Sequence, residues 1–445
     1  MSIVTVDEGA ELTHAQWQAR AGIGALDIDH LVRSRVLRLT PSGRYRLSFV
    51  GVVIFADALL YARPKFGAVD GLGMNDVLRI LRSYFSRSSA RRPHSDSERD
   101  PEFGDSEVLR EFDALRGLQD WFFVHGVYQR EQSISDLRGR PQWPRTIAKC
   151  PPLVTQDAVV YPVVLAERRE MTLDAISALQ IGLLRTLLER YGFPVPGSVH
   201  NAVAATGTGA WRWPLEESSR KYYERRLAVE RRSVFRTHSL RLFELLHEIL
   251  SSRLAAPDAQ PHIYGTTAFY AVWEDACRTG IACADAAQYG ALLGQPVWWS
   301  KGADGSKQRH EQEQIPDLVV RRGRWLLILD AKYYHPFPHA RPGGPDIVKQ
   351  LYYAESLRNP EAELLSIFLL PMPGATLPCF LGYATIEGAR RGFGTIEAWG
   401  LDPAALLLRY PAISADRANA ILDTIIRHRK GVAEFVGQAP PDVGS

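Results

Sequence analysis

Cysteine is scarce in this sequence, and what little there is forms no recognisable framework. The 445 residues contain four cysteines, Cys150, Cys277, Cys283 and Cys379. No Cys-x-x-Cys pair occurs, which argues against a structural zinc site and against a disulfide scaffold. Long apolar runs are missing too, because the longest, residues 49–56, ends at Asp57. No basic region followed by an apolar core marks the amino terminus, so we expect a cytoplasmic protein without a membrane anchor.

Lysine is also scarce in the sequence, and a nucleotide-binding loop is absent. Of 53 basic residues, 8 are lysines and 45 are arginines. Lysine can release its proton and arginine cannot, so the presence of Lys332 is a weak sign of chemistry. The Gly-x-x-x-x-Gly-Lys-Ser/Thr loop is absent, so any need for a nucleoside triphosphate points to a partner. A net charge of +3 is too small to establish a nucleic-acid partner.

The composition is that of a globular protein with two or three domains. Hydrophobic residues make up 46% and charged residues 23%. Residues 45–55 read as a strand pair entering a core, the period becomes helical from Thr172, and residues 256–261 are typical of a boundary. We therefore predict a mixed α/β domain over 1–165 that reads the target, a helical basic connecting region over 166–258, and a further domain over 259–445.

Two apolar segments that each carry an aspartate are the main feature of the last domain. Ile315-Pro316-Asp317 precedes one segment, Asp330-Ala331-Lys332 ends the other, and Gly323-Arg324 separates them. A II′ turn with glycine first places Asp317 opposite Asp330, with Cβ atoms roughly 5 Å apart. Strand alternation puts Lys332 on the same face. Opposed carboxylates destabilise a sheet unless a cation lies between them, and a divalent metal is the simplest one. A structural Asp-Lys ion pair is the alternative.

Predicted helices flank these two strands. The first spans Thr266 to Arg278, and its Glu274 is either a solvated residue or a further metal ligand. The second opens at Pro345-Asp346, and its Gln350 either bonds a phosphate or water at the site or is ordinary helix surface. Two more predicted strands follow, residues 364–371 and 378–385. The order of elements predicts an αβββαβ core within a protein that is mixed α+β overall.

This order, together with the Pro-Asp and the twelve residues before Asp-Ala-Lys, resembles the PD-(D/E)XK superfamily of restriction-endonuclease-like proteins. Within it, the chain looks like the LlaJI/McrC-like nuclease subunits of modification-dependent restriction systems. The matching segments are Val272-Trp273-Glu274, Ile315-Pro316-Asp317, Asp330-Ala331-Lys332-Tyr333-Tyr334 and Lys349-Gln350-Leu351-Tyr352-Tyr353, with looser matches at Phe49-Val50-Gly51 and Pro64-Lys65. Gln350-x-x-Tyr353 departs from the longer Gln-x-x-x-Tyr spacing of related nucleases, which leaves the role of Tyr353 open.

The resemblance implies hydrolysis of DNA phosphodiesters with Mg²⁺, for which Mn²⁺ can substitute. By position, the metal ligands would be Asp317, Asp330, the Ala331 carbonyl and Glu274. Lys332 would orient or activate the attacking water and stabilise the developing phosphorane charge, and Gln350 would assist. The resemblance also implies a separate AAA+ GTPase or ATPase partner, in agreement with the missing nucleotide-binding loop.

Basic residues mixed with aromatics mark two candidate nucleic-acid contacts. One is a proline-rich segment, expected to be non-helical, that contains Arg140, Trp143 and Arg145. A tryptophan that anchors a loop is an equally good interpretation. The other is the predicted helical region 215–254, where residues 220–241 include eight basic residues against two acidic ones. Its candidate contacts are Arg225, Arg226, Arg231 and Arg232, and a solvated helix face is the alternative.

Three functions stay open from the residues alone. The first is a Mg²⁺-dependent DNA endonuclease of a restriction or phage-defence system. The second is a catalytically inert DNA-binding scaffold that recruits or regulates a motor protein, and the third is a nuclease that acts on RNA. The intact aspartate pair and lysine favour an enzyme over a scaffold. The recognised target and the oligomeric state, including a homo-oligomer, stay undetermined.

Overall fold

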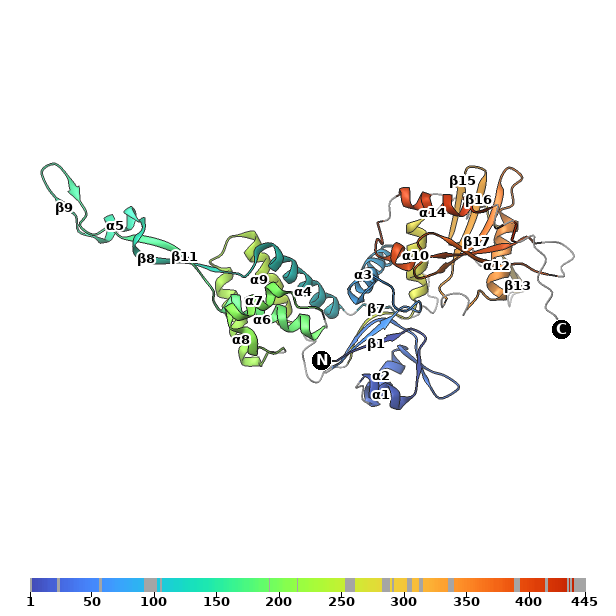
Figure 1. Cartoon of the computed structure of the whole chain (residues 1–445), viewed down its shortest axis with the longest axis horizontal. Helices are drawn as coiled ribbons and strands as arrows, with labels where there is room; N and C mark the ends of the chain where they lie inside the picture. The colour runs from blue at the N-terminus through green and yellow to red at the C-terminus, as the bar shows by residue number, and fades with distance from the viewer. Residues whose placement is uncertain are drawn as a thin grey trace. The chain divides into compact units, whose positions relative to one another are not determined.

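Helices and strands alternate along the computed structural model of the chain, which is a mixed α/β protein as predicted (Figure 1). The residues that the structure describes are 2–21, 25–55, 58–91, 102–104, 106–191, 193–213, 215–252, 261–281, 289, 292–301, 306–311, 315–334, 340–387, 393–412, 415–429, 432 and 434–435. Among the helices of these residues, none combines the length and the apolar composition that a membrane span requires.

The chain divides into two compact units. Unit 1 contains residues 105–262 with two short pieces, 1–3 and 54–59, and unit 2 contains residues 4–53, 60–104 and 263–445. These divisions do not coincide with the limits at 165 and 258 expected from the sequence. Strand pairing is the reason, because β5 (Val50–Ile54) and β12 (His262–Thr266) are neighbours in one sheet.

Unit 1 combines a group of packed helices with a two-stranded ribbon. The helices are α4 (Ser106–His125), α6 (Ala175–Arg190), α7 (Gly197–Thr206), α8 (Glu217–Arg231) and α9 (Thr237–Leu250). The ribbon pairs β8 (Arg130–Pro141) with β11 (Ala166–Thr172). It leads to α5 (Trp143–Lys149), β9 (Leu153–Val154) and β10 (Val159–Val160), as Figure 1 shows.

Local capping explains where two of these elements begin. Helix α6 begins after Asp174, whose side chain accepts hydrogen bonds from the backbone N–H groups of Ile176 and Ser177. The helix thus begins three residues after Thr172, where the helical period of the sequence starts. Helix α5 begins at Trp143, so the expectation of a non-helical segment there was wrong. Pro144 lies in the first turn of α5, where its missing N–H has no helical partner to lose.

The first part of unit 2 contains small sheets and three helices. One sheet has the order β1 (Ser2–Asp7), β6 (Ala58–Arg63), β5, β12 and β7 (Glu102–Gly104), and another pairs β4 (Tyr45–Leu47) with β2 (Glu11–Leu12) and β3 (Leu37–Leu39). The helices are α1 (His14–Ala21), α2 (Ala25–Arg33) and α3 (Met74–Arg91). Residues 45–55 form two strands, β4 and β5, as predicted, but the two lie in different sheets and do not pair with each other.

A five-stranded mixed sheet forms the second part of unit 2. Its order is β15 (Leu318–Arg322), β16 (Trp325–Ala331), β17 (Glu363–Pro371), β19 (Ile396–Leu401) and β18 (Cys379–Ala384). Strands β16, β17 and β19 are parallel, and the two edge strands are antiparallel to them. The associated helices are α10 (Phe269–Gly280), α12 (Gly344–Ser356), α13 (Pro403–Leu407) and α14 (Ala415–Arg427).

The helix, hairpin, helix and strand order predicted for this region is observed, with two differences. Strands β13 (Val297–Lys301) and β14 (Lys307–Glu311) pair with each other and do not join the five-stranded sheet. Strand β19 was not predicted, yet it lies between β17 and β18. Helix α12 packs on this sheet through a core that contains Val319, Ile328 and Tyr353. Burial of such side chains contributes about 1.5–3 kcal/mol each and fixes the helix against the hairpin.

Candidate active site

The hairpin β15–β16 has the predicted register. Leu318 pairs with Leu329 and Arg322 with Trp325, so one further step along the ladder places Asp317 opposite Asp330. Gly323 begins the two-residue turn with a φ of 59°, which glycine adopts without strain. Turn chemistry therefore brings the two aspartates together at one end of the sheet.

Backbone and side-chain contacts hold the three predicted residues in place. The Ala331 N–H donates to Asp317 Oδ2 at 2.8 Å. Lys332 Nζ lies 2.7 Å from Asp330 Oδ2, which confirms that the two side chains share a face. The Lys332 N–H donates to the Leu369 carbonyl at 2.8 Å and so extends the pairing of β16 with β17. Asp330 is only 2% exposed, and its charge is therefore poorly solvated.

Like charges and burial raise the pKa values of two carboxyl groups at the site. Burial, with the neighbouring Asp330 second, raises the pKa of Asp317 to about 6. Burial, followed by the charges of Asp317 and Asp330, raises the pKa of Glu274 to about 8. Helix α10 thus brings Glu274 into the electrostatic field of the aspartate pair. Three carboxyl groups share a site in which Lys332 is the nearest cation to Asp330.

Asp346 is a contact of the site that the sequence did not indicate. It lies in the first turn of α12, and its Oδ1 is 2.9 Å from Lys332 Nζ. Its Oδ2 accepts the Tyr334 hydroxyl at 2.8 Å and the Gly343 N–H at 3.3 Å. Burial alone would raise the pKa of Asp346, but the bonds from Lys332 and Tyr334 lower it below its usual value. The only sequence signal was an acidic residue at a helix start, which is common.

Gln350 and Tyr353 are buried and bond to the protein backbone. Gln350 Nε2 donates to the Ile328 carbonyl at 2.9 Å and to the Ile367 carbonyl at 3.4 Å, on two adjacent parallel strands. The Tyr353 hydroxyl donates to the Ile315 carbonyl at 3.1 Å. Gln350 is therefore not ordinary helix surface. Its amide connects α12 to the strands that end at the site, and a direct role in catalysis stays a prediction.

The donor set suits a hard divalent cation. Asp317, Asp330 and the Ala331 carbonyl offer oxygen atoms, and Mg²⁺ typically takes one or two carboxylates and retains several waters. The raised pKa values of Asp317 and Glu274 indicate an excess of negative charge that a cation would relieve. Within the described ranges, no group of three or more His, Cys, Asp or Glu side chains lies close enough to hold a metal. Glu274 thus stays a predicted ligand.

The candidate nucleic-acid contacts lie in unit 1. Arg140 is exposed at the end of β8, and Trp143 is 50% exposed with its ring edge-to-face with Tyr161. Arg145 is exposed on α5. The other four candidates lie in the second half of α8 or directly after it. Arg225 and Arg232 are exposed, Arg226 lies 3.8 Å from Asp174, and Arg231 lies 3.9 Å from Glu244.

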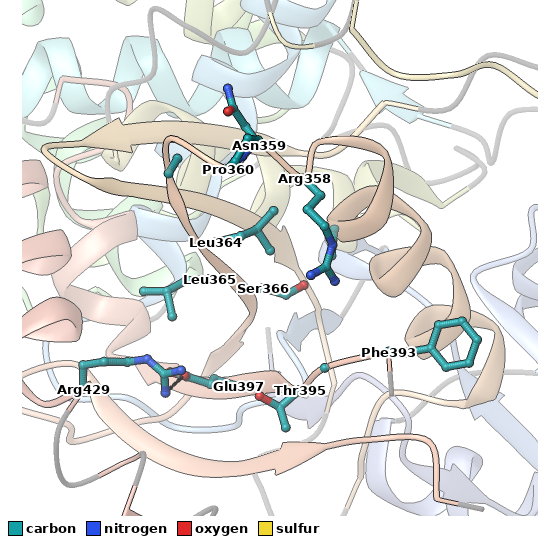
Figure 2. A pocket seen from close by; sticks show the side chains of 13 residues that line it. Arg358, Asn359, Pro360, Leu364, Leu365, Ser366, Phe393, Thr395, Glu397 and Arg429 are labelled. Carbon is teal, nitrogen blue, oxygen red and sulfur yellow. Dashed lines mark ion pairs between the residues drawn. The ribbon is translucent and has the colours of Figure 1, made fainter. Parts of the chain in front are cut away.

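A cavity of about 580 Å³ lies near the amino-terminal ends of β17 and β19 (Figure 2). Asp330 lies toward the other end of the sheet, because it pairs with Phe368 near the carboxyl end of β17. Glu397 is 1% exposed, and its Oε1 lies 2.5 Å from Arg429 Nη1. Its Oε2 accepts the Trp399 indole N–H at 3.0 Å. One guanidinium therefore neutralises one carboxylate here, with Arg358 on another wall of the cavity.

The mixed sheet, the helix that precedes it and the opposed aspartates followed by a lysine define a nuclease fold of the PD-(D/E)XK class. Residues 49–373, more than half of the chain, match the family model described as LlaJI restriction endonuclease. The chain belongs to the LlaJI restriction endonuclease family.

Individual relatives match smaller portions or match more weakly. The type II restriction enzyme BsuMI component YdjA of Bacillus subtilis (strain 168) is 28% identical over 188 residues, which are 40% of this chain and 37% of that protein. The chain thus spans less than two fifths of that relative. One chain from a Thermococcus gammatolerans assembly of McrB AAA+ hexamers with bound McrC aligns with this chain. The alignment covers 95% of this chain and 100% of that chain, with 14% identity and a TM-score of 0.33. The McrBC complex of that organism covers 55% of this chain, with 13% identity and a TM-score of 0.25.

Proposed function

We propose that this protein is the nuclease subunit of a restriction or anti-phage system and hydrolyses DNA phosphodiester bonds with Mg²⁺, for which Mn²⁺ can substitute. One observation carries the proposal: Asp317 and Asp330 are opposed across a hairpin whose register brings Lys332 to the same face. Membership of a restriction endonuclease family supports it.

The residues of the site supply distinct parts of phosphodiester hydrolysis. Asp317 and Asp330 would hold the metal with the Ala331 carbonyl, and Glu274 is the further ligand. The metal, when bound, neutralises charge on the phosphate and lowers the pKa of a bound water. Lys332 places an ammonium beside the same position, where it stabilises charge that develops on the phosphate oxygens. Burial lowers the pKa of Lys332, but Asp330 and Asp346 more than offset this and raise it above its usual value, so the ammonium stays charged.

A separate AAA+ NTPase is the proposed partner subunit. The sequence contains no phosphate-binding loop, so any need for a nucleoside triphosphate would point to a partner. The relative from Bacillus subtilis is named as one component of a restriction enzyme, which agrees with a multi-subunit system. Adding a purified candidate AAA+ NTPase to the cleavage reaction, with and without GTP or ATP, tests this part.

A cleavage assay on matched DNA and RNA duplexes, with Mg²⁺, Mn²⁺ or chelator, tests the proposal. We expect metal-dependent cleavage of DNA by the wild-type protein, with its partner where required. Asp330→Ala and Lys332→Ala should abolish cleavage and leave DNA binding and the circular dichroism spectrum unchanged. Equal cleavage by either variant would falsify the proposed site, cleavage of RNA alone would favour the RNA nuclease, and no metal-dependent cleavage would favour the scaffold.

DNA contacts in unit 1 are tested separately by binding. Arg225→Gln removes an exposed guanidinium group from α8, and Arg232→Gln removes one from the residue that follows this helix. If each contacts a phosphate, each variant reduces the slope of log affinity against log salt by about one. Arg212→Gln, which removes another exposed arginine of unit 1, is the control and should leave the slope unchanged.

A further inference from the structure

Lys332 is held by two carboxylates, and only one of them belongs to the aspartate pair. Its ammonium lies 2.7 Å from Asp330 Oδ2 and 2.9 Å from Asp346 Oδ1, and its side chain is 16% exposed. Asp330 is on β16, whereas Asp346 is on α12, which crosses the sheet. The lysine is therefore fixed from two independent elements.

Asp346 is itself fixed in position. The Tyr334 hydroxyl occupies its second oxygen at 2.8 Å, together with the Gly343 N–H at 3.3 Å. Further along α12, the Gln350 amide bonds to carbonyls of β16 and β17, and Tyr353 bonds to the segment before β15. The carboxylate is thus placed by a helix that is anchored to the strands of the site.

We propose that Asp346, oriented by Tyr334, is the positioning residue of Lys332 during catalysis, an inference that rests on the proposed nuclease function. Once a metal is bound, the Asp330 carboxylate would interact with both the metal and the Lys332 ammonium, so its attraction for Lys332 would be weaker. Asp346 is not one of the proposed metal ligands, so its charge stays available to the ammonium. It keeps Lys332 next to the reacting phosphate.

Asp346→Asn is the sharpest variant, because asparagine keeps the size and one oxygen that can accept from Tyr334 and Gly343, while the oxygen that faces Lys332 is replaced by an uncharged NH2 donor. We expect kcat for DNA cleavage to fall about 10–100-fold, the range seen when an outer partner of a catalytic group is removed. KM and the melting temperature should stay within error of wild type. Asp346→Glu should recover part of kcat, since it restores the charge.

Tyr334→Phe tests the second link. Since Tyr334 acts through Asp346, its removal should lower kcat by a smaller factor, and the double variant Asp346→Asn/Tyr334→Phe should be no slower than Asp346→Asn alone. Glu355→Gln is the matched control, because Glu355 lies on the same helix and pairs with Arg358 at 3.0 Å. It should cleave at the wild-type rate.

The outcomes separate this inference from the proposed function. Wild-type protein that cleaves no nucleic acid under any metal or partner condition overturns both. Cleavage by wild type and loss with Lys332→Ala, combined with a wild-type kcat for Asp346→Asn, overturns only the positioning role. A fall in melting temperature with unchanged kcat would show that Asp346 is a helix-capping residue alone. Independent, multiplying effects of Asp346→Asn and Tyr334→Phe would remove Tyr334 from the proposal.

Discussion

Two buried carboxylate sites lie on the same five-stranded sheet, and they differ in how their charge is neutralised. Near the amino-terminal ends of the strands, Glu397 has one guanidinium from Arg429 and one indole N–H from Trp399. At the other site, Asp317, Asp330 and Glu274 share one field, and the pKa values of Asp317 and Glu274 are raised.

This difference separates a structural ion pair from a site that is prepared for a ligand. A buried carboxylate that is paired with one cation has its charge neutralised within the fold. Carboxylates that outnumber their cations are costly in the folded protein, and a divalent metal removes that cost when it binds. Burial alone is therefore a poor guide to function, and the balance of charge is a better one.

Exchanging the carboxylates for amides gives the largest expected contrast. Asp330→Asn should lower the rate of Mg²⁺-dependent DNA cleavage by about 10³-fold or more, equivalent to about 4 kcal/mol of transition-state stabilisation. Glu397→Gln should leave the rate per folded molecule unchanged. Single-turnover cleavage with both variants measures this, and an equal loss in both would remove the distinction between the two sites.

Removing the cations should affect stability at both sites, but metal should rescue only one. Arg429→Met leaves Glu397 buried without its cation and should lower the free energy of unfolding by about 3–5 kcal/mol. Lys332→Met should also destabilise the metal-free protein. Added Mg²⁺ should stabilise wild type and both variants, since binding to the folded state alone is stabilising. It should narrow the deficit relative to wild type only in Lys332→Met, where it supplies the missing positive charge. Denaturant unfolding of both variants, with and without Mg²⁺, measures this difference. If Mg²⁺ rescues neither variant in this way, the result contradicts a metal site at the aspartates.

The raised pKa of Glu274 predicts how metal-free stability depends on pH. The folded carboxyl, with a pKa of about 8, holds its proton more tightly than the unfolded one. The ionisation of Glu274 therefore does not change the free energy of unfolding at low pH. As pH rises from about 4.5 to about 8, it lowers that free energy by an amount on the order of a few kcal/mol. Glu274→Gln should remove this pH-dependent loss of stability, so the wild-type protein should lose stability relative to the variant as pH rises from about 4.5 to about 8. A constant difference across pH would contradict the shared field.

Neutral groups near the two sites should give the smallest effects. Gln350→Ala removes the amide that bonds to carbonyls of β16 and β17 and should cost about 1–2 kcal/mol. Ser366, beside Glu397, is 4% exposed, and its Oγ has no hydrogen-bond partner among the described residues. Ser366→Ala should therefore raise the free energy of unfolding by up to about 1 kcal/mol. Thermal unfolding measures the change in stability of both variants. If Ser366→Ala lowers the free energy of unfolding as much as Gln350→Ala does, the expected difference between them is wrong.

Local chemistry made the hairpin predictable. A two-residue turn with glycine first sets the register, and the two-residue period of a strand then places Asp317, Asp330 and Lys332 on one face without reference to the rest of the chain. The helix before the hairpin followed from apolar periodicity, and the helix after it followed from the start signal Pro345-Asp346. Strand β19 was missed because it lies between β17 and β18, a sheet position that no local pattern specifies.

The sequence by itself determined the alignment of Asp317, Asp330 and Lys332, because neighbouring residues and one turn are enough to align them. Only the tertiary structure decided what surrounds it. Asp346 contacts Lys332, and Gln350 bonds to two strands, because α12 packs across the sheet and brings distant residues within hydrogen-bond range. The same packing put Glu274 in the field of the aspartates and buried Glu397 against Arg429. Such contacts depend on how elements pack, which spacing along the chain does not encode.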